Sequence, residues 1–151
     1  MTSLLCRPTQ SGKTFNMISK IEKIGYSDNT CHIIIVSNNL LETIQMNHRL
    51  NDKIKDKSFI LSSKSECVNI LSAIGIFLST DKRIMICCKN SKRLNDIDSL
   101  VNNKMINIDL NIWVDEADDM IASISPHIDE WIKSKKVKQV TMITATPKKS
   151  H

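Results

Sequence analysis

The sequence predicts an α/β domain built on a mostly parallel central sheet with helices on both faces. Three observations lead to this fold class. The chain has 151 residues, which suits a single domain. Short apolar runs typical of strands alternate with segments whose apolar residues recur at helical spacing. The strand-like runs, such as residues 32–36, are almost continuously apolar, as expected for parallel strands buried on both faces.

The first half of the chain predicts three strands, each followed by a helix. The predicted strands are residues 3–6, 32–36 and 58–61. Ser65 is expected to cap the third helix, because a serine hydroxyl can accept from a backbone N–H of the first turn. The apolar residues that define the helices are Phe15, Ile18, Ile21 and Ile24, then Leu40, Leu41, Ile44 and Leu50, and then Cys67, Ile70, Leu71, Ile74, Phe77 and Leu78.

Three more strands and two helices are predicted in the second half. The predicted strands are residues 83–88, 111–114 and 140–143. A short helix is expected over 94–101. Ser125 and Pro126 form a typical helix start, with a capping hydroxyl followed by proline at the first helical position. This start predicts a last helix through about residue 134. Its buried face is expected to contain Ile128, Trp131 and Ile132.

Several protein classes are excluded by composition. The chain has five cysteines, an odd number, and no Cys-x-x-Cys pair, which argues against a disulfide scaffold and a zinc ribbon. The longest aliphatic run, residues 33–36, is far too short for a transmembrane helix. The N-terminus lacks a basic start followed by a long apolar stretch, which argues against a secretory signal. We therefore expect an intracellular protein, in the cytoplasm or nucleus, with no membrane partner.

The charge balance allows nucleic acid as a partner. The formal net charge is +5 and the isoelectric point is about 9.0. A basic surface suits a polyanion, although a solvated lysine-rich surface would give the same balance. The bias toward Lys, Ile and Asn is typical of AT-rich codons, as in many large DNA viruses and low-GC bacteria.

The first stretch that indicates chemistry is residues 7–14, which read Arg-Pro-Thr-Gln-Ser-Gly-Lys-Thr. It follows a predicted strand and opens a helix, where a phosphate-binding loop belongs. Lys13 would reach the terminal phosphates and Thr14 would ligate Mg²⁺. The general pattern begins with glycine, where this chain has Arg7, and a surface turn is the alternative interpretation. The predicted nucleotide-binding residues are Pro8, Thr9, Gln10, Ser11, Gly12, Lys13 and Thr14.

The second stretch places two carboxylates at the end of an apolar strand. Asp115 and Glu116 directly follow residues 111–114. The carboxyl ends of strands are where ligands bind in open α/β sheets. Asp115 would hold Mg²⁺, and Glu116 would orient or deprotonate the attacking water, a division of roles that phosphoryl transfer requires. The alternative is an acidic turn at the start of the next helix.

The third stretch, residues 144–147, reads Thr-Ala-Thr-Pro and again follows an apolar strand. By itself it is only a turn before a proline. Its place in order after the other two stretches makes it more informative.

Taken in order, the three stretches resemble motifs I, II and III of the superfamily 2 helicases. Residues 115–118 have the letters of a DEAD box, and about 100 positions separate Lys13 from Asp115. The resemblance implies a RecA-like P-loop NTPase fold, a three-layer sandwich that uses ATP and Mg²⁺. Lys13 and Glu116 would be the catalytic residues, and Thr14 and Asp115 the metal ligands. The resemblance assigns motif III coupling to Asp118, Thr144 and Thr146.

The same resemblance implies contacts with the backbone of DNA or RNA. Ser62 falls at a backbone-contact loop of the family. Asn90 and Lys92 stand where the family has a Thr-Pro-Gly-Arg type motif, and the sequence departs strongly from that motif. Asn38 and Asn39 follow the second predicted strand, where the family has another backbone contact. The expected contact residues are therefore Asn38, Asn39, Ser62, Asn90 and Lys92.

Residues 1–151 resemble one RecA-like domain, whereas helicases of this family have two. The second domain, in a longer protein or a partner, would supply arginines that complete the ATP site. We expect Arg49, Arg83 and Arg93 of this chain to face away from that site. The alternatives are the ATPase motor of a viral DNA-packaging terminase, which tolerates a basic residue at the start of the loop, and a non-catalytic nucleotide-binding module. The Ser-Gly-Lys-Thr stretch also resembles thymidine kinase, whose zinc-ligand cysteines are not found here.

Overall fold

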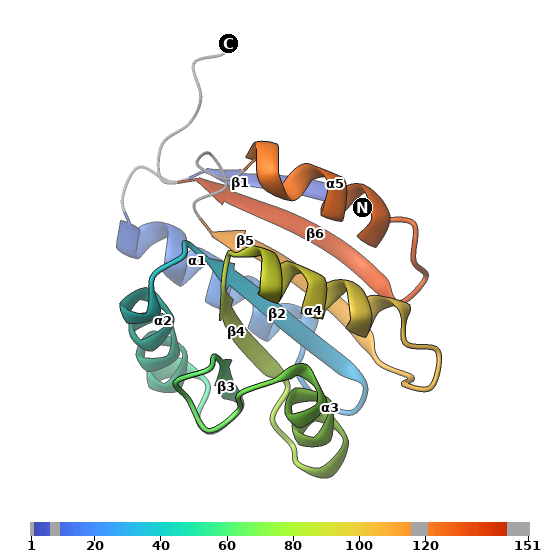
Figure 1. Ribbon diagram of the computed structural model, residues 1–151. Coiled ribbons are helices and arrows are strands. Elements are labelled where there is room, and N and C mark those ends of the chain that lie inside the picture. Colours follow the sequence, from blue (N-terminus) through green and yellow to red (C-terminus); the bar gives the residue numbers. More distant parts are fainter. Residues whose placement is uncertain (1, 7–9, 116–120, 145–151) are drawn as a thin grey trace.

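A computed structural model describes residues 2–6, 10–115 and 121–144 of the chain. In this part of the chain six parallel strands form one sheet in the order β1-β6-β5-β2-β4-β3 (Figure 1). The predicted α/β class with a parallel central sheet is confirmed. The strands are β1 (Thr2–Cys6), β2 (Thr30–Val36), β3 (Ser58–Leu61), β4 (Ile84–Cys88), β5 (Asp109–Asp115) and β6 (Val137–Thr144).

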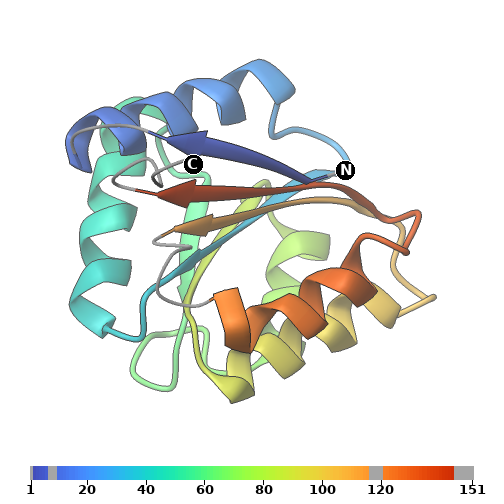
Figure 2. The same ribbon diagram turned by 90° about the horizontal axis from the view of Figure 1, so that it is seen from above.

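Helices cover both faces of the sheet and create two cores (Figure 2). One core lies under α1 (Gln10–Ile24) and α2 (Leu40–Lys53), where Ile34 and Trp113 are buried. The other core lies under the remaining helices, where Ile33 and Ile112 are buried. Successive strand residues point to opposite faces of the sheet, so neighbours such as Ile33 and Ile34 are buried in different cores. The helices over the second core are α3 (Ile70–Ser79), α4 (Ser91–Asn102) and α5 (Ile121–Trp131).

The path of the chain brings together strands that are far apart in the sequence. From β1 the chain crosses to β2 and then to the far edge at β3, and it returns through β4 and β5 to β6. β6 therefore lies between β1 and β5. In the strand register Ile143 of β6 is paired with Leu5 of β1 on one side and Asp115 of β5 on the other. The carboxyl ends of the strands that carry the three predicted motifs are thus level with one another.

The predicted cap of the third helix is wrong. Asn69 caps α3, and its side chain accepts from the backbone N–H of Ser72 at 2.9 Å. The Ser65 hydroxyl instead donates to the carbonyl of Ile60 at 2.7 Å, within the loop after β3. Both residue types are good caps, and the loop geometry decides which of them reaches the first turn.

The predicted start of the last helix is also wrong. α5 begins at Ile121, which places Pro126 inside the helix. A proline there removes one backbone hydrogen bond, the one that would reach back to the carbonyl four residues earlier. Ile124, Ile128 and Trp131 are buried against the sheet at helical spacing. Their packing outweighs the local preference for a start at Pro126.

The helical stripes include several residues that are exposed in the fold. A helix buries a stripe of limited width, so apolar residues at its margins stay in solvent. In the first two helices Met17 and Met46 are buried, although the expected stripes did not include them. In α5 Ile132 is exposed, whereas Ile124 is buried. The other exposed members of the expected stripes are Phe15, Ile24, Leu41, Ile44, Leu71 and Leu78.

Candidate nucleotide and nucleic-acid site

Lys13 and Asp115 form a buried ion pair at the carboxyl edge of the sheet. The Lys13 ammonium lies 2.6 Å from the Asp115 carboxylate, and the two side chains are 1% and 7% exposed. Lys13 comes from the first turns of α1, and Asp115 is the last residue of β5. The expected meeting of these two residues is therefore observed.

This ion pair is an expensive feature for a protein interior. Removing two charges from water costs several kcal/mol per ion, which their attraction and further hydrogen bonds must offset. An apolar pair of similar size would often be as stable. The placement of a lysine and an aspartate here is therefore weak evidence for a purely structural role, and it favours a binding role.

Arg49 reaches the same place from another helix. The Thr14 side chain is buried, and its hydroxyl accepts from the Arg49 guanidinium at 3.4 Å. Arg49 lies in the second half of α2. The expectation that Arg49 faces away is wrong, because this part of α2 lies beside the start of α1. The two helix segments enclose a pocket of about 230 Å³, which is lined by Thr14, Phe15, Ile18, Arg49, Asp52 and Lys53.

The donor atoms at this site suit Mg²⁺. Thr14 offers a hydroxyl and Asp115 a carboxylate, and Mg²⁺ prefers hard oxygen ligands. Within the described ranges there is no group of three or more His, Cys, Asp or Glu that could hold a metal ion. Mg²⁺ commonly binds one or two protein ligands and takes the rest from phosphates and water. The residues present therefore fit a metal ion that arrives with a nucleotide.

Some predicted site residues lie outside the described part of the chain, and others are described by their backbone alone. Pro8, Thr9, Glu116, Asp118 and Thr146 lie outside the described residues. Gln10 and Ser11 belong to α1 and Thr144 to β6, and only their backbone is described. Gly12 lies in the first turn of α1, one residue before Lys13.

Three of the five residues expected to contact nucleic acid line one pocket. Asn38, Ser62 and Asn90 border a pocket of about 210 Å³ next to the carboxyl ends of β2, β3 and β4. The Asn90 amide donates to the Asn38 side-chain oxygen at 3.2 Å. Sequence reasoning missed Lys64, which lines the same pocket two residues after Ser62 and adds a positive charge. Lys64 lies in the loop that contains Ser62, which was expected to contact a nucleic-acid backbone, and this position could have identified it.

The asparagines around this pocket also have structural roles. Asn39 caps α2, with its side chain accepting from the backbone N–H of Leu41 at 2.9 Å. Asn90 caps α4 and accepts from the backbone N–H of Arg93 at 3.0 Å. Lys92 is exposed in the first turn of α4. Arg93 is buried, its guanidinium lies 2.8 Å from the Asp96 carboxylate, and it lines the same pocket as Asn38 and Asn90.

Comparisons with known proteins do not identify this chain. No protein-family model matches it, and no curated protein matches it. In the described residues no helix is both long enough and apolar enough to cross a bilayer. The functional assignment therefore depends on the site itself.

Proposed function

We propose that this chain is the ATP-binding domain of a superfamily 2 nucleic-acid helicase or translocase, with a RecA-like fold. Such a domain couples ATP hydrolysis to the remodelling of DNA or RNA. The observation that carries the proposal is the buried contact between Lys13 and Asp115. A phosphate-binding lysine and a metal-binding aspartate must approach the same terminal phosphates, and this pair has that proximity.

Each residue of the site has a distinct task in this proposal. Lys13 binds the terminal phosphates, and the N-terminus of α1 adds the positive end of a helix dipole. Thr14 and Asp115 would hold Mg²⁺, which neutralises phosphate charge when it is bound. Glu116 orients the attacking water and accepts its proton. Glu116→Gln is therefore expected to preserve MgATP binding and to slow hydrolysis.

The position of β6 supports a coupling role for the third motif. β6 is paired with both β1 and β5, so Thr144 leaves the sheet between the two strands that lead to Lys13 and end at Asp115. A residue at the end of β6 is well placed to respond to a change at either neighbouring strand. We assign this role to Thr144 and Thr146, together with Asp118.

The pocket bordered by Asn38, Ser62 and Asn90 supports contact with a nucleic-acid backbone. It lies at the same edge of the sheet, beside rather than at the ATP site. Amide and hydroxyl groups with nearby Lys64 and Lys92 suit phosphate and sugar oxygens. Contacts with these oxygens position a protein on a nucleic acid without reading the base sequence. The proposed partner is therefore DNA or RNA bound through its backbone.

A second RecA-like domain completes the proposed enzyme. An arginine that stabilises the transition state of phosphoryl transfer is worth about 10³–10⁵ in rate. Without that domain, residues 1–151 are expected to bind MgATP weakly, to hydrolyse it near background and not to unwind a duplex. Steady-state ATPase and unwinding assays check this, and robust unwinding by the monomer would contradict the assignment.

The direct test of the proposal is calorimetric titration of the chain with MgATP. Lys13→Ala should weaken binding by about tenfold or more, because it removes a charged hydrogen-bond donor. Lys20→Ala is the matched control, since Lys20 is an exposed lysine of the same helix. Circular dichroism of both variants checks that they are folded. A wild-type chain that binds no MgATP, or a Lys13→Ala variant that binds it normally, would overturn the proposal.

A further inference from the structure

Arg49 stands out because it contacts a residue of the proposed ATP site from outside the three motifs. Its guanidinium donates to the Thr14 hydroxyl at 3.4 Å, across 35 positions of sequence. The rest of the Arg49 side chain is exposed on α2. Among the interactions of the described residues, this hydrogen bond is the polar contact that holds the guanidinium. A long exposed side chain with one weak contact can move at little cost.

The contact places Arg49 beside a residue that is proposed to bind Mg²⁺. Thr14 is the proposed hydroxyl ligand of Mg²⁺, so a guanidinium 3.4 Å from that oxygen would lie close to the metal ion. Two cations at such a distance repel each other unless an anion lies between them. The terminal phosphates of a nucleotide supply that anion, because they bind Mg²⁺ and still carry free oxygens.

The other charges of the pocket also favour an anion. Its lining includes the cations Arg49 and Lys53 and the single carboxylate of Asp52. The Lys53 ammonium lies over the Phe15 ring, 5.1 Å from its centroid, which gives this lysine a different contact from that of Arg49. The formal charge of the lining is therefore positive, and of its two cations Arg49 is the one that contacts Thr14, a proposed metal ligand.

We propose that Arg49 is a phosphate-binding residue supplied by this domain itself. When MgATP binds, the guanidinium gives up the Thr14 hydroxyl and donates to oxygens of the outermost phosphate. A planar guanidinium can donate two parallel hydrogen bonds to such a group, which a lysine cannot. The inference rests on the proposed function and deepens it, because it adds a residue that distinguishes a triphosphate from a diphosphate.

Calorimetric titration with MgATP and with MgADP tests this assignment. Arg49→Ala should weaken MgATP binding by about tenfold or more and MgADP binding by much less. Arg49→Lys should recover part of the loss, since it keeps the charge without the planar donor pair. Lys53→Ala is the matched control, because it removes one positive charge from the same pocket, and it should leave the ATP-to-ADP preference unchanged. Thermal unfolding verifies that each variant is folded.

The outcomes separate this inference from the function on which it rests. If the wild-type chain binds MgATP and Arg49→Ala binds both nucleotides as well as wild type does, the Arg49 assignment is overturned and the proposed function stands. An equal loss for both nucleotides also overturns it, because the contact would not be to the outermost phosphate. A wild-type chain that binds neither nucleotide would overturn both proposals.

Discussion

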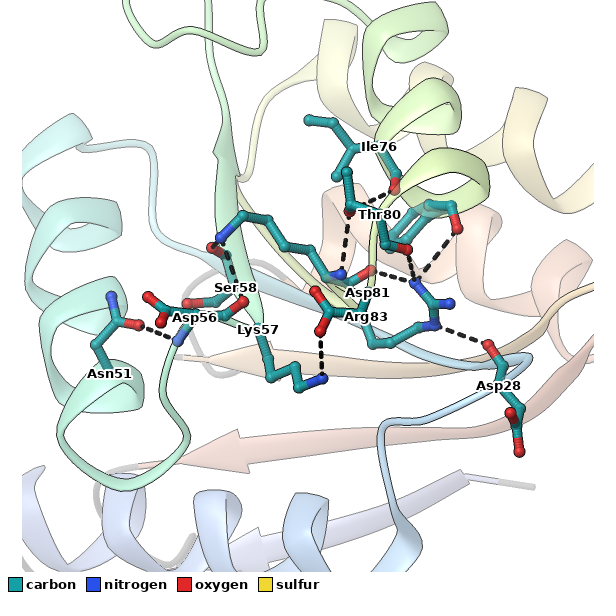
Figure 3. A network of polar contacts seen from close by, with 11 residues as sticks. Asp28, Asn51, Asp56, Lys57, Ser58, Ile76, Thr80, Asp81 and Arg83 are labelled. Atoms are coloured by element: carbon teal, nitrogen blue, oxygen red, sulfur yellow. Dashed lines mark hydrogen bonds and ion pairs between the residues drawn. The ribbon is translucent and has the colours of Figure 1, made fainter.

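The two edges of the sheet use positively charged side chains in different ways. At the carboxyl edge Lys13 contacts the carboxylate of Asp115, and Arg49 contacts the hydroxyl of Thr14. At the amino edge Arg83 donates to backbone carbonyls, including those of Asp28 at 2.7 Å and Thr80 at 2.8 Å (Figure 3). Backbone carbonyls cannot leave without changing the path of the chain, whereas side-chain partners can be exchanged for a ligand.

The neighbours of Arg83 reinforce this structural role. Lys57 and Asp81 form an ion pair at 3.0 Å (Figure 3). Lys82 donates to the carbonyl of Asp56 at 3.3 Å. Thr80 closes the last turn of α3, and its hydroxyl donates to the carbonyl of Ile76 at 2.7 Å. These contacts join the loops before β3 and β4 to the end of α3. Arg83 is therefore held by backbone carbonyls in a structural role, whereas Lys13 and Arg49 contact side chains that a ligand can replace.

His32 is a second structural group toward the amino edge. It is fully buried, and its Nδ1 accepts from the indole N–H of Trp113 at 3.0 Å. Its Nε2 is 2.6 Å from the carbonyl of Gly25, so the neutral ring that carries its proton on Nε2 satisfies both contacts. Gly25 has a φ of +104°, a conformation that suits glycine, and it directly follows α1. Burial lowers the pKa of His32 to about 4, although the Gly25 carbonyl acts in the opposite direction.

The largest expected effect on stability comes from breaking the carboxyl-edge ion pair. Lys13→Ala leaves Asp115 buried without its ammonium partner, so the free energy of unfolding should fall by about 3–5 kcal/mol. Replacing both residues, as Lys13→Met with Asp115→Leu, should recover much of that stability and none of the MgATP binding. Urea unfolding and calorimetric titration measure the two quantities. Recovery of nucleotide binding by the apolar pair would contradict a binding role for this edge.

The next largest effect is a pH dependence that originates in His32. The unfolded chain binds a proton near the ordinary pKa of 6.5, whereas folded His32 stays neutral until about pH 4. The unfolded state therefore binds more protons in this range, and stability should fall as the pH falls from about 6.5 to 4. The full contribution is about 3 kcal/mol.

Urea unfolding at a series of pH values measures this contribution. His32→Asn should flatten the decline between pH 6.5 and 4, and His48→Asn is the matched control at an exposed position. A decline that is equally steep in His32→Asn would show that other groups cause it.

A smaller effect is expected from Arg83, and it should separate the two edges. Arg83→Ala removes charged hydrogen bonds to the loop carbonyls, and the free energy of unfolding should fall by about 2 kcal/mol. The affinity for MgATP should not change, because Arg83 belongs to the amino edge. Measuring unfolding and nucleotide binding on the same preparation checks both. A loss of affinity in a folded Arg83→Ala variant would break the distinction between the edges.

The smallest expected effect concerns nucleic acid. If Lys92 contacts a backbone phosphate, Lys92→Ala should reduce the slope of log affinity against log salt concentration by about one unit. Fluorescence anisotropy with a labelled single strand at several salt concentrations measures the slope. Lys20→Ala removes the same charge on the opposite face of the sheet and should leave the slope unchanged. Binding that does not respond to salt would argue against backbone contact.

The strands were predictable because their signal is local. Residues 58–61 are β3 as expected, β2 and β5 extend their predicted runs by one or two residues at an end, and β4 begins one residue later than predicted. The helix starts were less predictable, since Ser65 and Pro126 are good local signals that the fold does not use. Whether such a residue begins a helix depends on how the segment around it packs against the sheet.

The sequence by itself determined the parallel α/β class and which residues of the site belong together. A strand that leads to Lys13 and a strand that ends at Asp115 must present both residues at one edge if the sheet is parallel. Only the tertiary structure decided that β6 lies between them and that Arg49 reaches Thr14. That contact depends on how α2 lies beside the start of α1. This placement depends on side chains from both helices and the sheet together, so no single stretch of sequence encodes it.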